Sequence, residues 1–253
     1  MAQGAKDPGL EKTPFRDPSG KPYVGRAHQR IERFSKDPVL EDLLSELRAG
    51  FGPQYWWPAD TAFEVMVGCV LTQNTAWRNV EMALANLRSK KLLTPGSILS
   101  SDPVVLEEGL RPSGYFRAKT KKLCALSRWY LDVGGLRALT SRPLEDLRSE
   151  LLAVHGVGPE TADSILCYGA GRRTVVIDTY TRRLLSRHGL AAGDESYETL
   201  RQSMQKRLVD SQAVYEEFHA LCVRVGYSGC KPKPRCEDCP VTTPVELRGP
   251  NDV

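Results

Sequence analysis

The sequence lacks any long apolar run. No stretch approaches the roughly 18 apolar residues that a helix needs to cross a bilayer, and the opening MAQGAKDPGLEKTPF has no apolar centre of the kind found in secretory signal peptides. We therefore expect a soluble, cytoplasmic protein that does not use a membrane. The chain also lacks a strong net charge: 35 Lys and Arg against 31 Asp and Glu give +4, so the placement of basic residues says more about partners than the total does.

Strand patterns and repeats are nearly absent. Only RTVVI, residues 173–177, is rich in β-branched residues, and no fixed-period repeat is visible. From Asp37 onward one helical pattern follows another, beginning with DPVLEDLLSELRAGFG, which has an Asp-Pro start and a Gly stop. Further helices are predicted in the segments 61–90 (two helices with a break near residues 73–75), 116–135, 143–156, 158–171, 178–189, 196–209 and 213–226. With 253 residues, 41% of them hydrophobic, the chain can bury a sizeable core, and we predict an all-α fold.

The N-terminal segment has a different composition. Residues 1–36 are rich in Pro, Gly and charge, with few apolar residues at any regular spacing. Such a segment cannot bury much apolar surface, so we expect a flexible N-terminal tail.

The seven cysteines fall into two groups. Three stand singly in apolar stretches and are expected to be buried hydrophobic side chains: Cys69, Cys124 and Cys167. Four crowd into 18 residues near the C-terminus: Cys222, Cys230, Cys236 and Cys239. In an intracellular protein such crowding favours a metal site over disulfide bonds.

The stretch HGVGPETADS, residues 155–164, bends the chain between two predicted helices. Its glycines permit a positive φ and a close approach of the backbone to a ligand. Free amides at the start of the second helix can bind an anion. The bend is therefore a candidate for binding a DNA phosphate without recognising the base sequence, through Gly156, Val157, Gly158 and Thr161. The same pattern, taken alone, also fits a plain helix–helix turn with a glycine C-cap.

Longer stretches around this bend resemble a known family. LLAVHGVGPETADSILCYGAGRRTVVIDTYTRRLL, WWPADTAFEVMVGCVLTQNTAWRNVEMALANL and LRPSGYFRAKTKKL are similar, in order and spacing, to the endonuclease III superfamily of helix-hairpin-helix DNA glycosylases. They most resemble its monofunctional branch, typified by bacterial 3-methyladenine DNA glycosylases. The resemblance covers roughly residues 40–239.

The resemblance implies an architecture and a partner. It predicts a six-helix barrel domain over residues 54–173 that contains the hairpin, and a second helical domain that joins residues 37–53 to residues 174–253 and carries the cysteine loop. In this family the DNA groove lies between the two domains. The expected partner is double-stranded DNA with damaged bases, bound at the nucleoid by a monomer.

Asp178 is the candidate catalytic residue. It follows Gly158 by 20 positions, at the start of DTYTRRLL, where the family has its essential aspartate. Cleavage of an N-glycosidic bond builds positive charge on the sugar, which a carboxylate stabilises while it helps to position water. An aspartate before a helix is also a common N-cap, and the two roles are compatible. His155 and His219 are expected to be surface or packing residues.

Glu160 stands where bifunctional relatives carry a lysine. That lysine attacks the sugar as an amine and forms a Schiff base, and a carboxylate cannot do so. We therefore expect base excision by water without lysine-dependent strand cleavage. Glu160 itself is expected to favour the start of its helix through the helix dipole.

Three tryptophans are candidate walls of a base pocket. A glycosylase draws its target base out of the stack, and aromatic faces offset part of that cost. A methylated purine is cationic, so cation–π attraction favours it further. The resemblance implies that Trp56 and Trp77 hold the base with Trp57 beside them, and core packing is the alternative for each. Gln73 matches the residue that fills the gap left by the extruded base, although it also fits a polar turn. Arg182 is expected at a phosphate-contacting rim.

CKPKPRCEDCP resembles the iron–sulfur loop of endonuclease III relatives. A [4Fe–4S] cluster commonly takes four thiolates. The family's usual last cysteine is absent from VTTPVELRGPNDV, so the expected ligands are Cys222, Cys230, Cys236 and Cys239. A non-cysteine fourth ligand and a zinc ion are the alternatives.

The sequence thus predicts a monofunctional DNA N-glycosylase of base excision repair, with an alkylated purine such as 3-methyladenine as the favoured substrate. Some alkyladenine-specific relatives lack the metal loop and carry a functional lysine where this chain has Leu221. Three alternatives remain open: an endonuclease III-like glycosylase acting on oxidised or deaminated pyrimidines, a non-catalytic protein of the same fold that binds damaged DNA, and a zinc-dependent DNA-binding regulator.

Overall fold

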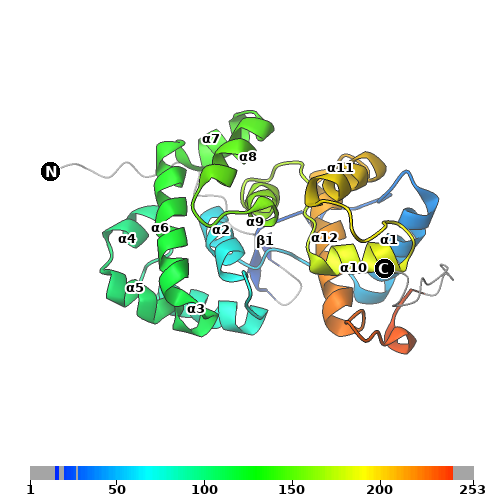
Figure 1. Cartoon of the computed structure of the whole chain (residues 1–253), viewed down its shortest axis with the longest axis horizontal. Helices are drawn as coiled ribbons and strands as arrows, with labels where there is room; N and C mark the ends of the chain where they lie inside the picture. Colours follow the sequence, from blue (N-terminus) through cyan, green and yellow to red (C-terminus); the bar gives the residue numbers. More distant parts are fainter. Residues whose placement is uncertain (1–14, 17–19, 27, 242–253) are drawn as a thin grey trace. The chain divides into compact units, whose positions relative to one another are not determined.

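The computed structural model describes residues 15–16, 20–26 and 28–241, which form two compact units (Figure 1). Unit 1 consists of the described residues of Met1–Val24 together with Trp57–Arg172. Unit 2 consists of the described residues of Gly25–Trp56 and Arg173–Val253. The all-α prediction is confirmed: strand structure in the described residues is limited to one two-residue antiparallel pair, β1 (Phe15–Arg16) with β2 (Pro22–Tyr23), and one isolated bridge. No helix among these residues is both long and apolar enough to cross a membrane.

Unit 1 is built around helix α2. Its described helices are α2 (Ala62–Leu71), α3 (Trp77–Ser89), α4 (Pro95–Ser100), α5 (Pro103–Leu110), the 3₁₀ turn η1 (Arg111–Ser113), α6 (Phe116–Asp132), α7 (Gly135–Ser141), α8 (Leu144–Ala153), α9 (Pro159–Ser164) and the π-helix η2 (Ile165–Gly169). Every residue of α2 after Ala62 is buried, and α2 packs against α3, α6, α9 and η2. A helix that is apolar on all sides belongs in a core.

The break between α2 and α3 lies where the sequence predicts it, around Gln73. Lys119 of α6, almost fully buried, donates its Nζ protons to Leu71 O at 2.8 Å, Thr75 Oγ1 at 2.6 Å and Ser113 O at 2.7 Å. Burial lowers the pKa of Lys119 to about 8. A buried ammonium is tolerated when all its protons are bonded, so Lys119 holds the turn that carries Gln73.

Unit 2 is built around helix α12. Its described helices are α1 (Pro38–Phe51), α10 (Thr179–Arg187), α11 (Tyr197–Arg207), α12 (Gln212–Ser228) and the 3₁₀ turn η3 (Cys236–Asp238). α12 packs against α1 and α10. Asp37 caps α1 by accepting the N–H groups of Val39 and Leu40, which is the start that the Asp-Pro pattern predicts.

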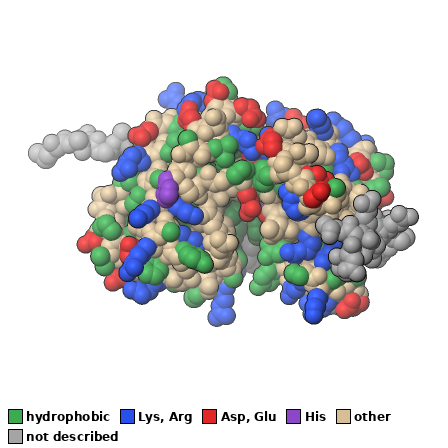
Figure 2. All heavy atoms as spheres, in the orientation of Figure 1, with side chains coloured by type: hydrophobic (Ala, Val, Ile, Leu, Met, Phe, Trp, Pro, Cys, Tyr) green, Lys and Arg blue, Asp and Glu red, His purple; other side chains and the backbone are tan. Residues whose placement is uncertain are grey.

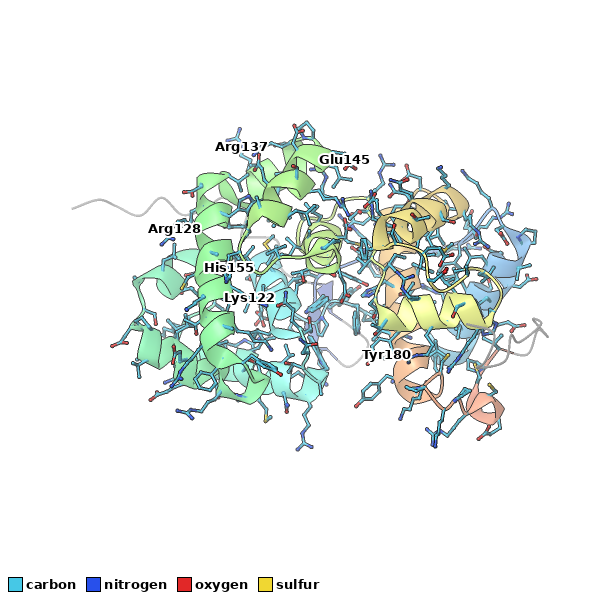
Figure 3. The ribbon with its side chains drawn as sticks, in the orientation of Figure 1. Lys122, Arg128, Arg137, Glu145, His155 and Tyr180 are labelled. Atoms are coloured by element: carbon cyan, nitrogen blue, oxygen red, sulfur yellow. The ribbon has the colours of Figure 1, made fainter. Side chains whose placement is uncertain are left out.

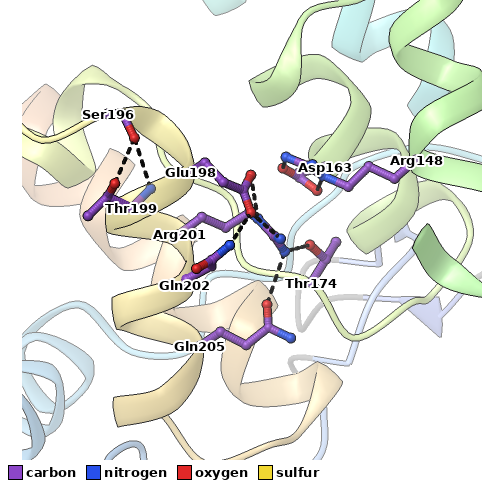
Figure 4. A network of polar contacts seen from close by, with 9 residues as sticks. All are labelled: Arg148, Asp163, Thr174, Ser196, Glu198, Thr199, Arg201, Gln202 and Gln205. Carbon is purple, nitrogen blue, oxygen red and sulfur yellow. Dashed lines mark hydrogen bonds and ion pairs between the residues drawn. The ribbon is translucent and has the colours of Figure 1, made fainter.

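The strand-like run at residues 173–177 forms no strand, which agrees with the all-α prediction. Thr174, Val175, Val176 and Ile177 are all buried, without a neighbouring strand in the described chain. The buried Arg201 of α11 reaches Thr174 Oγ1 at 3.3 Å and bonds Glu198 at 2.7 Å (Figure 4). The β-branched residues there reflect burial, which is also what strand propensity largely measures.

Half of the predicted N-terminal tail, residues 1–36, lies outside the described residues, namely positions 1–14, 17–19 and 27. Within its described part, Tyr23 and Phe34 are buried at 1% and 3% exposure. Val24 exchanges two backbone hydrogen bonds of 2.7 Å with Trp57. These positions differ from a loosely attached tail, because single apolar side chains in a polar segment can still be packed when the backbone is paired.

Candidate functional site

The hairpin between α8 and α9 has two glycines with different requirements. Gly156 has φ 83°, and a Cβ atom there would lie 2.3 Å from Lys122 Cγ, so only glycine fits. Gly158 has φ −96° and is exposed, with open space around an added Cβ. Val157 between them is buried and donates its N–H to Val154 O at 3.0 Å. The first glycine therefore serves the turn, while the second leaves the backbone open to a ligand.

Three residues that the sequence named as separate DNA contacts meet at this hairpin. Gln73 Nε2 donates to Gly156 O and to Thr161 Oγ1, both at 3.0 Å. Lys122 Nζ donates to Gln73 Oε1 at 2.5 Å. The α2–α3 turn, α6 and the hairpin are thus joined through one amide side chain. In the sequence Lys122 is one of several basic residues between positions 117 and 122, and a lysine on a helix gives no signal of its partner.

Basic side chains surround this place on unit 1. Figure 3 shows Lys122 and His155 beside each other where α6 passes the hairpin, with Arg128 further along α6. In the space-filling view, Lys and Arg side chains lie close to the histidine exposed on this face (Figure 2). Positive charge beside an open backbone loop suits phosphate contact, which is strongly dependent on salt.

Substitution of the two glycines separates their roles. Gly156→Ala is expected to lower the free energy of unfolding by roughly 1–3 kcal/mol, because alanine is strained at positive φ and collides with Lys122. Gly158→Ala is expected to lower the free energy of unfolding by less than about 1 kcal/mol, as a poorer N-cap of α9, and to weaken DNA binding, because its methyl group projects where a phosphate would approach. Urea unfolding and DNA titrations of both variants measure this. Equal stability loss in the two variants contradicts the assignment.

Two of the predicted pocket tryptophans belong to unit 1. Trp57, only 4% exposed, packs edge-on against Trp77 and against Tyr168 of η2, with ring centroids 5.5 and 5.4 Å apart. Trp77 begins α3 and is half-buried. Edge-to-face pairs at these distances are stabilising, so Trp57 is a core residue here and Trp77 is the more accessible ring. Tyr168 was missed because it sits in an apolar helical run.

Asp178 is held by its own helix. It caps α10, accepting the N–H of Thr181 on Oδ1 at 2.7 Å. Its other oxygen, Oδ2, lies 3.7 Å from His219 Nε2 on α12, and both side chains are nearly buried. Burial by itself would raise the pKa of Asp178, but the neighbouring His219 and the Thr181 N–H outweigh it and keep the pKa below its ordinary value. The result is an ionised carboxylate with little contact with water.

The third tryptophan, Trp56, lies in unit 2 together with Asp178. The rings of Trp56 and His219 meet edge to face, with centroids 6.0 Å apart and planes at 69°. Trp56 is half-buried. The candidate base-stacking residue and the candidate catalytic residue therefore share His219 as a neighbour. His219 was expected only as a surface or packing residue, since a histidine on an apolar helix carries no signal of such neighbours.

Two adjacent carboxyl groups lie buried on α12. Glu216 accepts the N–H of Arg26 at 2.5 Å and an Nε2 proton of Gln212 at 2.7 Å. Glu217 pairs with Arg48 at 2.9 Å and accepts the N–H of Gln54. Burial raises the pKa of Glu216 to about 8 and the pKa of Glu217 to about 7. Both connect α12 to the segments that flank α1.

The protonation of Glu216 makes the stability depend on pH. Its pKa is higher in the folded than in the unfolded chain, so its stabilisation is present below about pH 4.5 and is lost as the pH rises through about 8. Wild type is expected to lose on the order of 3 kcal/mol more than Glu216→Gln between pH 5 and 8. Urea unfolding at several pH values measures it, with the exposed Glu81→Gln as control. Parallel curves for wild type and Glu216→Gln would contradict the assignment.

The arginines of α10 are engaged with backbone carbonyls. Arg182, predicted at the DNA rim, donates to Gly193 O at 3.2 Å and Glu195 O at 2.7 Å, and so anchors the loop before α11. Arg187 donates to Cys230 Sγ at 3.2 Å and Lys231 O at 2.7 Å. These contacts attach the cysteine loop to α10, which begins at Asp178.

The four candidate metal ligands occupy different environments. Cys222 is fully buried on α12, with its pKa raised by burial and with Thr181 and Asp178 among its neighbours. Cys230 and Cys239 are half-buried and Cys236 is exposed on η3. Within the part of the chain that the structure describes, no three His, Cys, Asp or Glu side chains form a metal-binding group. Cys230 contributes to the raised pKa of Cys222, and Cys230 and Cys236 contribute to that of Cys239, so the four thiols lie near one another.

The comparisons with known proteins bear on the same segments. A family model described as "HhH-GPD superfamily base excision DNA repair protein" matches residues 67–209, more than half of the chain, including Gln73, the hairpin and Asp178. The chain belongs to the HhH-GPD superfamily. It is a DNA repair glycosylase, and the predicted family and enzyme class are confirmed.

This HhH-GPD glycosylase is 40% identical over 194 residues to a Methanocaldococcus jannaschii protein named "Putative DNA repair glycosylase", covering 76% of this chain and 88% of that one. It is 30% identical over 206 residues to endonuclease III of Thermotoga maritima, covering 79% and 89%. The structure of H. pylori 3-methyladenine DNA glycosylase bound to 1,N6-ethenoadenine matches with a TM-score of 0.65 and 28% identity over 75% of this chain and 96% of that one. A trapped endonuclease III–DNA intermediate, at 22% identity and TM-score 0.66, shares the fold.

Proposed function

We propose that this HhH-GPD glycosylase is monofunctional and releases a damaged base by hydrolysis. Asp178 is the catalytic residue: its carboxylate stabilises the positive charge that grows on the sugar and helps to position the attacking water. The observation that carries the proposal is the state of this carboxylate, which is ionised, nearly buried and fixed by the Thr181 N–H. A carboxylate in a poorly solvated place interacts more strongly with a nearby cation than one in water.

The presence of Glu160 after the hairpin supports the proposal that the enzyme has no lysine-dependent lyase activity. It is exposed in the first turn of α9, directly after the hairpin. A carboxylate has no nitrogen with which to form a Schiff base. The amine of Lys122, whose side chain lies beside Gly156, donates to Gln73 and is thereby engaged.

The DNA contacts proposed for unit 1 follow from the hairpin. The backbone at Gly156, Val157 and Gly158 contacts a phosphate of double-stranded DNA, and Thr161 and Gln73 lie directly behind it. Gln73 fills the gap that the extruded base leaves. In unit 2, Arg182 anchors the loop before α11 through Glu195 O and adds positive charge to a rim that contacts phosphates. The protein acts on damaged duplex DNA as a monomer.

The favoured substrate is an alkylated purine. Trp56 and Trp77 are half-buried aromatic rings, which suit a cationic methylated base through stacking and cation–π attraction. The similarity to a 3-methyladenine DNA glycosylase at 28% identity supports this choice. The similarity to endonuclease III at 30% identity favours oxidised or deaminated pyrimidines as the second candidate.

A panel of duplexes, each with one lesion, tests the function. Alkylated adenine, thymine glycol and uracil are scored for strand cleavage with and without alkali. The proposal expects cleavage of the alkylated duplex only after alkali. Cleavage without alkali, together with an adduct trapped by borohydride, contradicts the monofunctional mechanism. Binding of damaged DNA without release of any base would leave only the alternative of a damage-binding protein.

The cofactor proposal keeps the four ligands that the sequence predicts. We propose that Cys222, Cys230, Cys236 and Cys239 bind a [4Fe–4S] cluster, with a non-cysteine fourth ligand or zinc as the alternatives. Arg187 and the backbone of the loop hold Cys230 close to α10, and Cys230 is among the neighbours that raise the pKa of the buried Cys222. The cluster has a structural role and takes no part in the reaction.

Metal analysis of the purified protein tests this proposal. We expect iron and acid-labile sulfide in stoichiometric amounts, a loss of most iron in both Cys236→Ser and Cys222→Ser, and retention of iron in Cys124→Ser. A colourless protein with stoichiometric zinc supports the alternative metal. Retention of iron in Cys222→Ser would mean that the fourth ligand is not Cys222.

A further inference from the structure

Helix α12 contacts both functional side chains of unit 2 through one residue. His219 is 5% exposed and points its Nε2 toward Asp178 Oδ2 at 3.7 Å. The same imidazole meets the ring of Trp56 edge to face at 6.0 Å. The distance to Asp178 is longer than a direct N–H···O hydrogen bond, so His219 borders the carboxylate on its Oδ2 side while Thr181 holds Oδ1.

The backbone of Trp56 is held from the same face of α12. Glu216, one helical turn before His219, accepts the N–H of Arg26. The neighbouring Gly25 lies against the carbonyl of Trp56, where an added Cβ would be 2.0 Å from that oxygen. Glu216 thus fixes the backbone of residues 25–26, which lies against the Trp56 carbonyl, while His219 contacts the Trp56 ring.

We propose that His219 is a positioning residue that holds the Asp178 carboxylate and the Trp56 ring in one fixed arrangement. This inference rests on the proposed function, in which Trp56 stacks on the base and Asp178 acts at the sugar to which that base is attached. The Trp56 ring and the Asp178 carboxylate must contact neighbouring atoms of one nucleotide, so the rate of base release depends on their positions relative to each other. Misplacement of a reacting group by about 1 Å costs on the order of 10²-fold in rate.

Single-turnover base release by the full-length protein tests the proposal. His219→Leu is expected to lower the rate constant on the order of 10²-fold while the Kd for lesion-bearing DNA changes by less than about threefold, because a positioning residue acts on the reaction step. His219→Gln, whose amide nitrogen reaches the place of Nε2, is expected to recover most of the rate. His219→Asn, which is too short, is expected to behave like the leucine variant. His28→Leu, at an exposed histidine of the same unit, is the matched control.

A double-mutant cycle separates positioning from general loss of structure. In an Asp178→Asn background the His219→Leu change is expected to have almost no further effect on the rate, since the group that it positions is gone. Base release by His219→Leu at the wild-type rate overturns the inference, as do equal rates for the glutamine and asparagine variants. If wild type itself releases no base from any lesion, the proposed function has failed instead.

Discussion

Replacing Asp178 by asparagine is expected to abolish base release without unfolding the protein. Asparagine caps helices as well as aspartate does, so the bond from the Thr181 N–H, 2.7 Å in wild type, can be kept. The negative charge is lost, and with it the stabilisation of the developing sugar cation. Loss of one aligned electrostatic group in a site with little water costs on the order of 10³-fold in rate.

Single-turnover release of the lesion identified by the duplex panel measures this effect. Asp42→Asn removes a charge from an exposed position of α1 in the same unit and is expected to leave the rate unchanged. The urea midpoint and the Kd for damaged DNA serve as controls for fold and binding. A fall in rate of less than about tenfold would mean that Asp178 is only a helix cap.

The helices that carry the site were predictable because local signals and burial agree in them. Asp37 and Pro38 begin α1 where the pattern places its start, and the break at Gln73 separates two runs of apolar spacing. The two glycines of the hairpin predicted a turn. Gly156 has a φ of 83°, which few other residues tolerate. A helix can be predicted from the sequence when its intrinsic propensity, its capping residues and its hydrophobic pattern all agree.

Other features could not be predicted from the sequence, because they depend on contacts between residues far apart along the chain. Glu216 and Glu217 look like the polar face of a helix, yet both are nearly fully buried. Their partners, Arg26 and Arg48, are more than 160 positions away along the chain. Residues 173–177 have strand composition, yet they find no partner strand in the described chain.

The site residues divide in the same way. Gln73, Gly156 and Thr161 were named from local pattern and resemblance, and they do meet. What holds them was hidden: Lys122 is one lysine in a basic run, and its bond to Gln73 depends on how α6 passes the hairpin. Arg182 shows the reverse case. Its charge predicted a DNA contact, but in the structure its guanidinium donates to the carbonyl oxygens of Gly193 and Glu195.

Breaking the ion pair inside the hairpin is expected to cause the largest loss of stability. Arg148 of α8 donates Nε and Nη2 to the two carboxylate oxygens of Asp163 in α9, at 2.9 and 3.0 Å (Figure 4). The Asp163 side chain is 0% exposed and that of Arg148 is 11% exposed. Arg148→Met leaves a buried carboxylate without its partner, which costs roughly 3–5 kcal/mol.

Urea unfolding of the full chain measures this loss, and DNA titration measures its consequence. The pair connects the two helices on either side of Gly156 and Gly158, so Arg148→Met is also expected to weaken binding to undamaged duplex. The double variant Arg148→Met, Asp163→Leu removes both charges and is expected to regain much of the lost stability. Glu150→Gln, on the same helix as Arg148, breaks a partly exposed pair with Arg142 and is the control that should change little. If Arg148→Met unfolds at the wild-type urea concentration, the hairpin geometry depends on backbone packing rather than on this pair.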